Sequence, residues 1–161
     1  MRINKQIVEI LKDRGWYIST AESCSGGFLA HTITNASGSS DYFSYGYITY
    51  SDQAKIQTLN IQKNVLEEST SYSGKIAELM ATGVRSKTES TFGLAITGIA
   101  PPGDPSSSLP TGTVFIGVSS SKYTTHSRFK IKTKSRCRFK RQVVKITLNL
   151  LEDIVHEYNK N

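Results

Sequence analysis

Two stretches of the chain share one design, in which a strand-like segment runs into small polar residues that begin a helix. In the first, residues 16–20 are aromatic and β-branched and lead into Thr20-Ala-Glu-Ser-Cys-Ser-Gly-Gly27, after which residues 28–33 can form a helix. In the second, a strand that ends at Tyr50 is followed by a helix cap at Ser51. Such junctions are typical of α/β proteins, whose ligands gather beyond the carboxyl ends of the strands.

The same alternation continues along the chain. Helical patterns cover residues 4–12, 28–35, 51–59, a longer segment that Ser73 caps, and about 136–158. Strand patterns cover residues 16–20, 45–50, 92–97, 113–118 and 124–131, the last two as a hairpin. We therefore expect a three-layer α/β/α sandwich with a mostly parallel, mixed sheet of about five strands. The 161 residues fit a single domain over 1–161.

The first junction places Ser23 where a strand ends, and we interpret it as a nucleophile. Backbone N–H groups at a helix start lack internal partners and carry partial positive charge, so they could stabilise an oxyanion beside Ser23. Gly26 and Gly27 would let a substrate approach the backbone closely. The alternative is structural, because serine is a preferred N-cap residue and Ser23 or Ser25 could simply cap the helix.

A base for Ser23 has to come from elsewhere in the sequence. None of the three histidines, His31, His126 and His156, stands beside a turn signal, so a Ser-His-Asp triad has little support. Lysine can serve when its amine is neutral, and Lys55 follows the Ser51 cap in the opening turn, where a cation is disfavoured. Asp52, three residues earlier on the same face, favours the charged form, so the direction of the net effect stays open. Tyr50 could pass a proton between Ser23 and Lys55. A solvated helix lysine explains Lys55 equally well.

The charge is uneven. The formal net charge is +7, and residues 128–145 hold nine lysines and arginines without one acidic residue. This segment is consistent with a phosphorylated small molecule, a nucleic-acid backbone or plain solubility. Because only Phe129 and Phe139 could stack bases, we do not expect nucleic acid as the main partner.

Several classes of protein are disfavoured by composition. The two cysteines, Cys24 and Cys137, are too few for a disulfide scaffold, and no Cys/His spacing resembles a zinc site. We expect no metal and no organic cofactor. The chain has no apolar run near 18 residues and no signal-peptide pattern, so we expect a cytoplasmic protein without a membrane partner. A homo-oligomer stays open.

Five separated motifs together resemble one known family. They are TAESCSGG, GSSDYF, GYITYSDQAK, LAITGIA and PTGTVFIG, in that order over most of the chain. The set resembles the C-terminal domain of the competence/damage-inducible protein CinA and the stand-alone nicotinamide-nucleotide amidohydrolases, called PncC. This resemblance implies a serine amidohydrolase that converts nicotinamide mononucleotide to nicotinate mononucleotide and ammonia in pyridine-nucleotide salvage.

The resemblance also assigns roles to individual residues. The family's nucleophile falls on Ser23, its lysine on Lys55 and its assisting tyrosine on Tyr50. In the implied mechanism, backbone N–H groups from Ser25 to Gly27 hold the oxyanion. The substrate's phosphate would need cations or a helix start. The candidates for it are Thr97, Gly98, Arg136 and Arg141, and ordinary surface charge would explain the two arginines as well.

The chain departs from the family pattern in the long Pro/Gly/Ser-rich loop of residues 98–112. Pro101 stands where relatives usually have glycine, and Leu109 stands where a lysine is common. These changes affect the expected substrate preference more than the Ser/Lys pair. Two other function classes remain: a non-catalytic module that binds a nucleotide or a protein, and a nucleic-acid accessory protein that uses residues 128–145.

Overall fold

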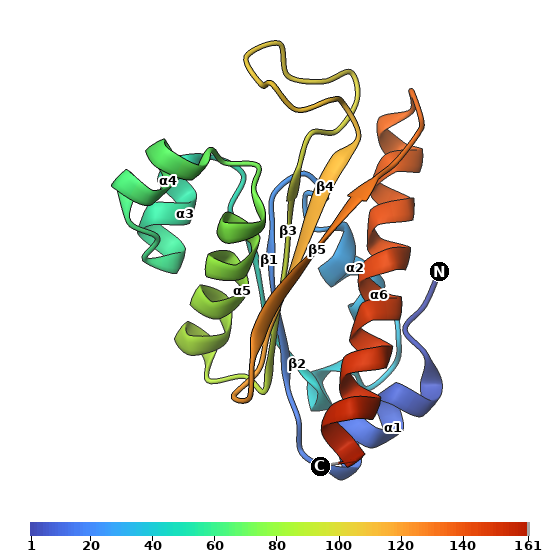
Figure 1. Ribbon diagram of the computed structural model, residues 1–161. Helices are drawn as coiled ribbons and strands as arrows, with labels where there is room; N and C mark the ends of the chain where they lie inside the picture. Colours follow the sequence, from blue (N-terminus) through green and yellow to red (C-terminus); the bar gives the residue numbers. More distant parts are fainter. Residues whose placement is uncertain (161) are drawn as a thin grey trace.

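The computed structural model describes residues 1–160 and shows a central sheet between two layers of helices (Figure 1). The helices are α1 (Lys5–Asp13), α2 (Phe28–Thr34), the 3-10 turn η1 (Ser39–Asp41), α3 (Asp52–Leu59), α4 (Lys63–Ser69), α5 (Gly74–Thr88) and α6 (Arg136–Lys160). The strands are β1 (Ile18–Glu22), β2 (Phe43–Ile48), β3 (Phe92–Gly98), β4 (Thr113–Ser119) and β5 (Thr124–Lys130). Among these residues, no helix combines the length and apolarity needed to span a bilayer.

The five strands form one sheet in the order β2-β1-β3-β4-β5. β1 pairs in parallel with both β2 and β3, whereas β4 is antiparallel to β3 and to β5. Four of the five strands therefore run in one direction, and β4 runs against them. The predicted three-layer α/β/α sandwich with a mixed sheet of about five strands is confirmed.

Each face of the sheet has its own core. α1, α2 and α6 cover one face, and the cluster there includes Ile18, Leu94 and Ile96. α3, α4 and α5 cover the other face, where Ala21 and Ala95 pack with residues of α5. Because successive side chains of a strand point to opposite faces, these residues show which face of the sheet the other side chains of β1 and β3 point to.

The helix α5 lies close to the sheet because two strand positions in front of it are glycine. A Cβ atom built on Gly117 would lie 2.1 Å from the carbonyl oxygen of Ala77, and one built on Gly93 would lie 2.1 Å from that of Ala81. Any larger residue at either position would push the helix away.

Most predicted elements are present with shifted ends. The first strand was expected at residues 16–20, and β1 lies two residues later. The second was expected at residues 45–50, and β2 begins and ends two residues earlier. α4 was not expected. Ser51 and Ser73 are the N-caps that were predicted: the Ser51 hydroxyl accepts from the Ala54 N–H at 3.1 Å, and the Ser73 hydroxyl accepts from the Ile76 N–H at 3.2 Å.

The topology brings the ends of β1, β2 and β3 to one edge of the sheet. The parallel register pairs Glu22 with Ile48 on one side and with Ile96 on the other. The loop that follows β3 rises above this edge before β4 begins (Figure 1). η1 precedes β2, so the Gly38-Ser39-Ser40 segment lies at the opposite end of the sheet.

Candidate active site

The turn after β1 opens into a hollow at the carboxyl edge of the sheet. Ser23 is 5% exposed, and its backbone N–H donates to the carbonyl of Ile96 at 2.9 Å. The hollow has a volume of about 100 Å³. It is lined by Ser23, Cys24, Tyr50, Tyr72, Gly98, Ile99, Ala100, Gly103, Asp104 and Arg136. Five segments that are separated in the sequence therefore meet around this hollow.

Strand alternation places Ser23 and Lys55 on the same side of the sheet. Ala21 faces the α5 layer, and Glu22 faces α2, so Ser23 returns to the α5 side. The same argument puts Thr97, two residues after Ala95, on that side. Lys55 comes from α3, which belongs to this layer, and it is only 1% exposed.

Lys55 is held by a neighbouring carboxylate. Its Nζ lies 2.9 Å from Oδ1 of Asp52, one turn earlier on α3. Burial alone would raise the pKa of Asp52, but hydrogen bonds from Ser71 and Lys55, together with the Lys55 charge, outweigh burial and lower it. Within residues 1–160 the structure shows no hydrogen bond between Lys55 and Ser23.

Tyr50 lies in the hollow but is bound to a different partner than expected. Its hydroxyl accepts a hydrogen bond of 2.6 Å from Nη2 of Arg136, and the side chain is 56% exposed. Arg136 also donates from Nη1 to the carbonyl of Pro101 at 2.9 Å. Arg136 thus joins the start of α6 to the end of β2 and to the long loop, and no described contact places Tyr50 between Ser23 and Lys55.

The start of α2 is occupied by the protein's own carboxylate. Glu22, 1% exposed, accepts from the N–H groups of Gly27 at 3.1 Å, Leu29 at 3.0 Å and Ala30 at 2.8 Å. The N-cap residue is Gly27, with a φ of 89° and no side-chain cap. The alternative that Ser23 or Ser25 caps this helix is therefore wrong.

The same contacts correct the predicted oxyanion donors. The Gly27 N–H is used by Glu22, and the Gly26 N–H donates to the carbonyl of Ser23 at 3.0 Å. Gly26 and Gly27 consequently have no free N–H to offer, because the chain folds back on itself in this turn. The Ser25 N–H has no acceptor among residues 1–160, and the buried Ser25 hydroxyl has no partner there either.

The four candidates for phosphate binding separate in the structure. Gly98 and Arg136 line the hollow. Thr97 is fully buried, and its hydroxyl donates to the carbonyl of Ser71 at 2.7 Å. Arg141 is exposed and does not line the hollow. Thr97 and Arg141 therefore do not line the hollow: the Thr97 hydroxyl is bonded to Ser71, and Arg141 faces solvent.

The sequence interpretation missed Lys140. A Cβ atom built on Gly26 would lie 2.9 Å from Lys140 Nζ, so this amine covers the turn that carries Ser23. Arg136 and Lys140 stand four residues apart on α6 and so occupy the same face. That spacing was the signal that could have identified Lys140.

Tyr72 and Asp104 were also missed; both line the hollow, and their side chains are hydrogen-bonded to each other. Burial raises the pKa of Tyr72 to about 12, with help from its hydrogen bond to Asp104. Hydrogen bonds from Ser106 and from Tyr72 lower the pKa of Asp104. A neutral phenol and a charged carboxylate therefore stand where the segment before α5 meets the long loop.

Comparison with known proteins agrees with this architecture. The family model described as the CinA C-terminal domain matches residues 1–155. A CinA-like protein of Chloroherpeton thalassium is 44% identical over 121 residues, which cover 75% of this chain and 29% of that protein. The chain thus spans less than a third of that relative's length.

Solved structures give the same result. The crystal structure of a competence-damaged protein (CinA) superfamily protein from Klebsiella pneumoniae superposes with a TM-score of 0.89 at 25% identity, over 94% of each chain. The competence/damage inducible protein CihA from Agrobacterium tumefaciens gives a TM-score of 0.88 at 29% identity, over 92% of this chain and 91% of that one. With the family model matching nearly its whole length, this chain belongs to the CinA C-terminal domain family.

Proposed function

We propose that this protein is a serine amidohydrolase that deamidates nicotinamide mononucleotide to nicotinate mononucleotide and ammonia. One observation carries the proposal. A nearly buried serine, Ser23, opens into a hollow of about 100 Å³ that Arg136 also lines, on the same side of the sheet as the buried Lys55. A serine, an amine base and a cation for an anionic substrate are the groups that this reaction needs.

In the proposed reaction, Lys55 in its neutral form takes the proton of the Ser23 hydroxyl. A relay through Tyr50 would require the Tyr50 hydroxyl to leave Arg136. The Ser23 oxygen attacks the carboxamide carbon, and the tetrahedral intermediate then loses its C–N bond as Lys55 returns the proton to the leaving ammonia. Water attacks the resulting ester and releases the carboxylic acid and Ser23. The reaction needs no metal or redox partner.

The oxyanion requires a donor other than Gly26 and Gly27. Of the predicted donors, the Ser25 N–H is the one without an acceptor among residues 1–160, so it is the candidate that is left, although Ser25 is fully buried and does not line the hollow. One such donor typically accounts for about 3 to 4 kcal/mol of transition-state stabilisation. The substrate's phosphate would lie against Arg136, which already faces the hollow.

The test is ammonia release from nicotinamide mononucleotide by the wild type and by two variants. We expect Ser23→Ala and Lys55→Met to lose activity by at least about a thousandfold. Ser44→Ala and Lys75→Met change exposed residues away from the hollow and serve as matched controls. Circular dichroism and thermal unfolding check that each variant folds.

Each result has a defined meaning. Unchanged release in Ser23→Ala or Lys55→Met removes that residue from the mechanism. If the wild-type protein releases no ammonia between about pH 6 and 10, the proposal is overturned, and the protein is then a non-catalytic member of the family.

A further inference from the structure

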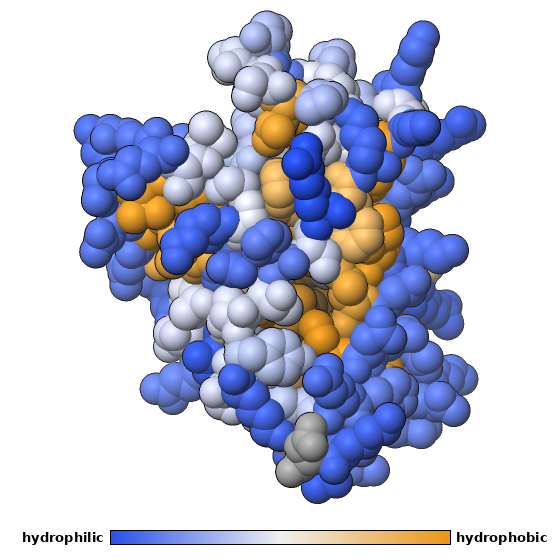
Figure 2. All heavy atoms as spheres, in the orientation of Figure 1, coloured by the Kyte–Doolittle hydropathy of each residue, from blue (hydrophilic) through white to orange (hydrophobic). Residues whose placement is uncertain are grey.

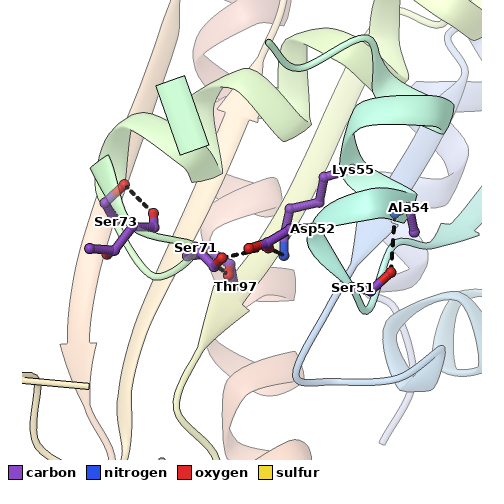
Figure 3. A network of polar contacts seen from close by, with 8 residues as sticks. Ser51, Asp52, Ala54, Lys55, Ser71, Ser73 and Thr97 are labelled. Carbon is purple, nitrogen blue, oxygen red and sulfur yellow. Dashed lines mark hydrogen bonds and ion pairs between the residues drawn. The ribbon is translucent and has the colours of Figure 1, made fainter. Parts of the chain in front are cut away.

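Asp52 lies at the centre of a polar network that reaches Lys55 from the solvent side. Oδ1 of Asp52 accepts from Lys55 Nζ at 2.9 Å and from the Ser71 hydroxyl at 2.5 Å (Figure 3). Lys55 is 1% exposed at its side chain, whereas Asp52 is 54% exposed. The carboxylate therefore anchors a buried amine while it remains in contact with water itself.

The network continues to the strand beside Ser23. The carbonyl of Ser71 accepts from the Thr97 hydroxyl at 2.7 Å, and Thr97 is the penultimate residue of β3 (Figure 3). The preceding residue of β3, Ile96, accepts the Ser23 N–H at 2.9 Å. Two short hydrogen bonds thus connect the anchor of Lys55 to the strand that also fixes the backbone of Ser23.

The other ionisable groups near Lys55 point elsewhere. Glu22, on β1, faces α2, and Asp104, on the long loop, accepts a hydrogen bond from Tyr72. Tyr72 is a neutral phenol, and burial raises its pKa further, to about 12. Tyr50 is bound to Arg136. Among residues 1–160, Asp52 is the carboxylate within ion-pair distance of Lys55.

We propose that Asp52, supported by Ser71, is a positioning residue that orients the Lys55 amine and governs how tightly it holds its proton. This inference rests on the proposed amidohydrolase function. A carboxylate 2.9 Å from an ammonium group stabilises the charged form relative to the neutral amine.

The experiment compares the pH dependence of kcat/KM in the wild type, Asp52→Asn and Ser71→Ala. Asparagine keeps the size of the side chain and removes its charge. We therefore expect the acid limb of the pH profile, where kcat/KM falls as the pH is lowered, to move to lower pH by about one unit in Asp52→Asn. Ser71→Ala leaves the Asp52 charge in place, so its acid limb does not move to lower pH although kcat falls. Asp41→Asn breaks a comparable but remote pair, Asp41 with Lys12 at 2.8 Å, and is the matched control.

A purely structural role predicts a different result. If Asp52→Asn lowers kcat/KM equally at every pH and leaves the acid limb where it is in the wild type, the proposal is overturned. The same holds if Asp41→Asn moves the limb as much as Asp52→Asn does.

A second measurement needs no substrate. The 13Cε resonance of Lys55, assigned by its absence in Lys55→Met, reports the proton on the amine, and we expect its titration midpoint to fall in Asp52→Asn. An unchanged midpoint contradicts the proposal. If the wild type releases no ammonia, the proposed function fails, and this titration still decides whether Asp52 controls the proton on Lys55.

Discussion

The carboxylate of Glu22 accepts a hydrogen bond of 2.8 Å from the backbone N–H of Ala30, so a buried negative charge stands at the start of α2. This contact links the last residue of β1 to the first turn of the next helix. It also uses the electropositive end of α2, which would otherwise attract a ligand anion. Under the proposed function, an anion in the hollow would therefore have to be held by side chains such as Arg136 rather than by this helix.

The first prediction concerns Glu22. Glu22→Ala should destabilise the fold by about 3 kcal/mol, because it leaves three N–H groups at a buried helix start without their acceptor. Urea unfolding measures the change, and Glu22→Gln, which keeps one acceptor oxygen, should lose less. Glu9→Ala, at an exposed position of α1, is the control and should stay within about 0.5 kcal/mol of the wild type. Equal stability of Glu22→Ala and Glu9→Ala would contradict this account.

The sequence predicted the sandwich because its strands and helices carry clear apolar patterns. The sequence patterns located the ends of these strands and helices less accurately. Trp16 is aromatic and was assigned to the first strand, but it precedes β1 and packs edge-on against Phe92 at 5.8 Å and Tyr158 at 5.0 Å. α4 was missed because Leu66 is its one buried residue among those described, which leaves no apolar stripe to detect.

The sequence predicted the site residues that directly follow strand ends. It did not predict which hydrogen-bond partners their side chains have. Ser23 and Tyr50 meet in one hollow as the parallel strands imply. The capping of α2 by Glu22 depends on how a tight turn folds back, and no spacing rule describes it. Likewise, Arg141 was selected by charge, whereas helical geometry turns Lys140 toward the Ser23 turn and leaves Arg141 about 100° further round.

The second prediction concerns the packing of α5. Gly117→Ala should destabilise the fold by about 2 kcal/mol, because the new methyl group would meet the Ala77 carbonyl oxygen at 2.1 Å and force α5 from the sheet. Chemical denaturation gives the size of the effect. Ser86→Ala changes an exposed residue of the same helix and should be neutral. A wild-type midpoint for Gly117→Ala would show that α5 moves without cost.

The third prediction separates Lys140 from Arg141. The outer side of α6 is hydrophilic (Figure 2), and neither residue has an ion-pair partner among residues 1–160. Because Lys140 covers the Ser23 turn, Lys140→Ala should raise KM for nicotinamide mononucleotide about tenfold with little change in kcat. Arg141→Ala should leave KM within about twofold. Both constants come from initial rates of ammonia release.

A substrate without phosphate supplies the control for Lys140. Nicotinamide riboside has the same carboxamide and no phosphate, so Lys140→Ala and the wild type should process it with the same kcat/KM. If Lys140→Ala lowers kcat/KM for both substrates, Lys140 contributes to the reaction or to the stability of the fold rather than to binding the phosphate.

The fourth prediction concerns Cys24, which lines the hollow next to Ser23 and is nevertheless 4% exposed. Burial raises the pKa of its thiol to about 12, although Arg136 and Lys140 act in the opposite direction. At pH 8 only about one thiol in ten thousand is then a thiolate, so Cys24 should be inert as a nucleophile. Cys137 is exposed and should react freely.

Titration with Ellman's reagent at pH 8 checks this prediction. The native wild type should show one fast thiol per chain and the protein unfolded in guanidinium two, whereas native Cys137→Ser should show none. Modification of Cys24 should accelerate as pH rises from about 8 to 10, because the thiolate fraction grows with pH below its pKa. A fast thiol in native Cys137→Ser at pH 8 would mean that Cys24 is a thiolate exposed to the hollow. The activities of Ser23→Ala and Cys24→Ala would then decide which of the two residues is the nucleophile.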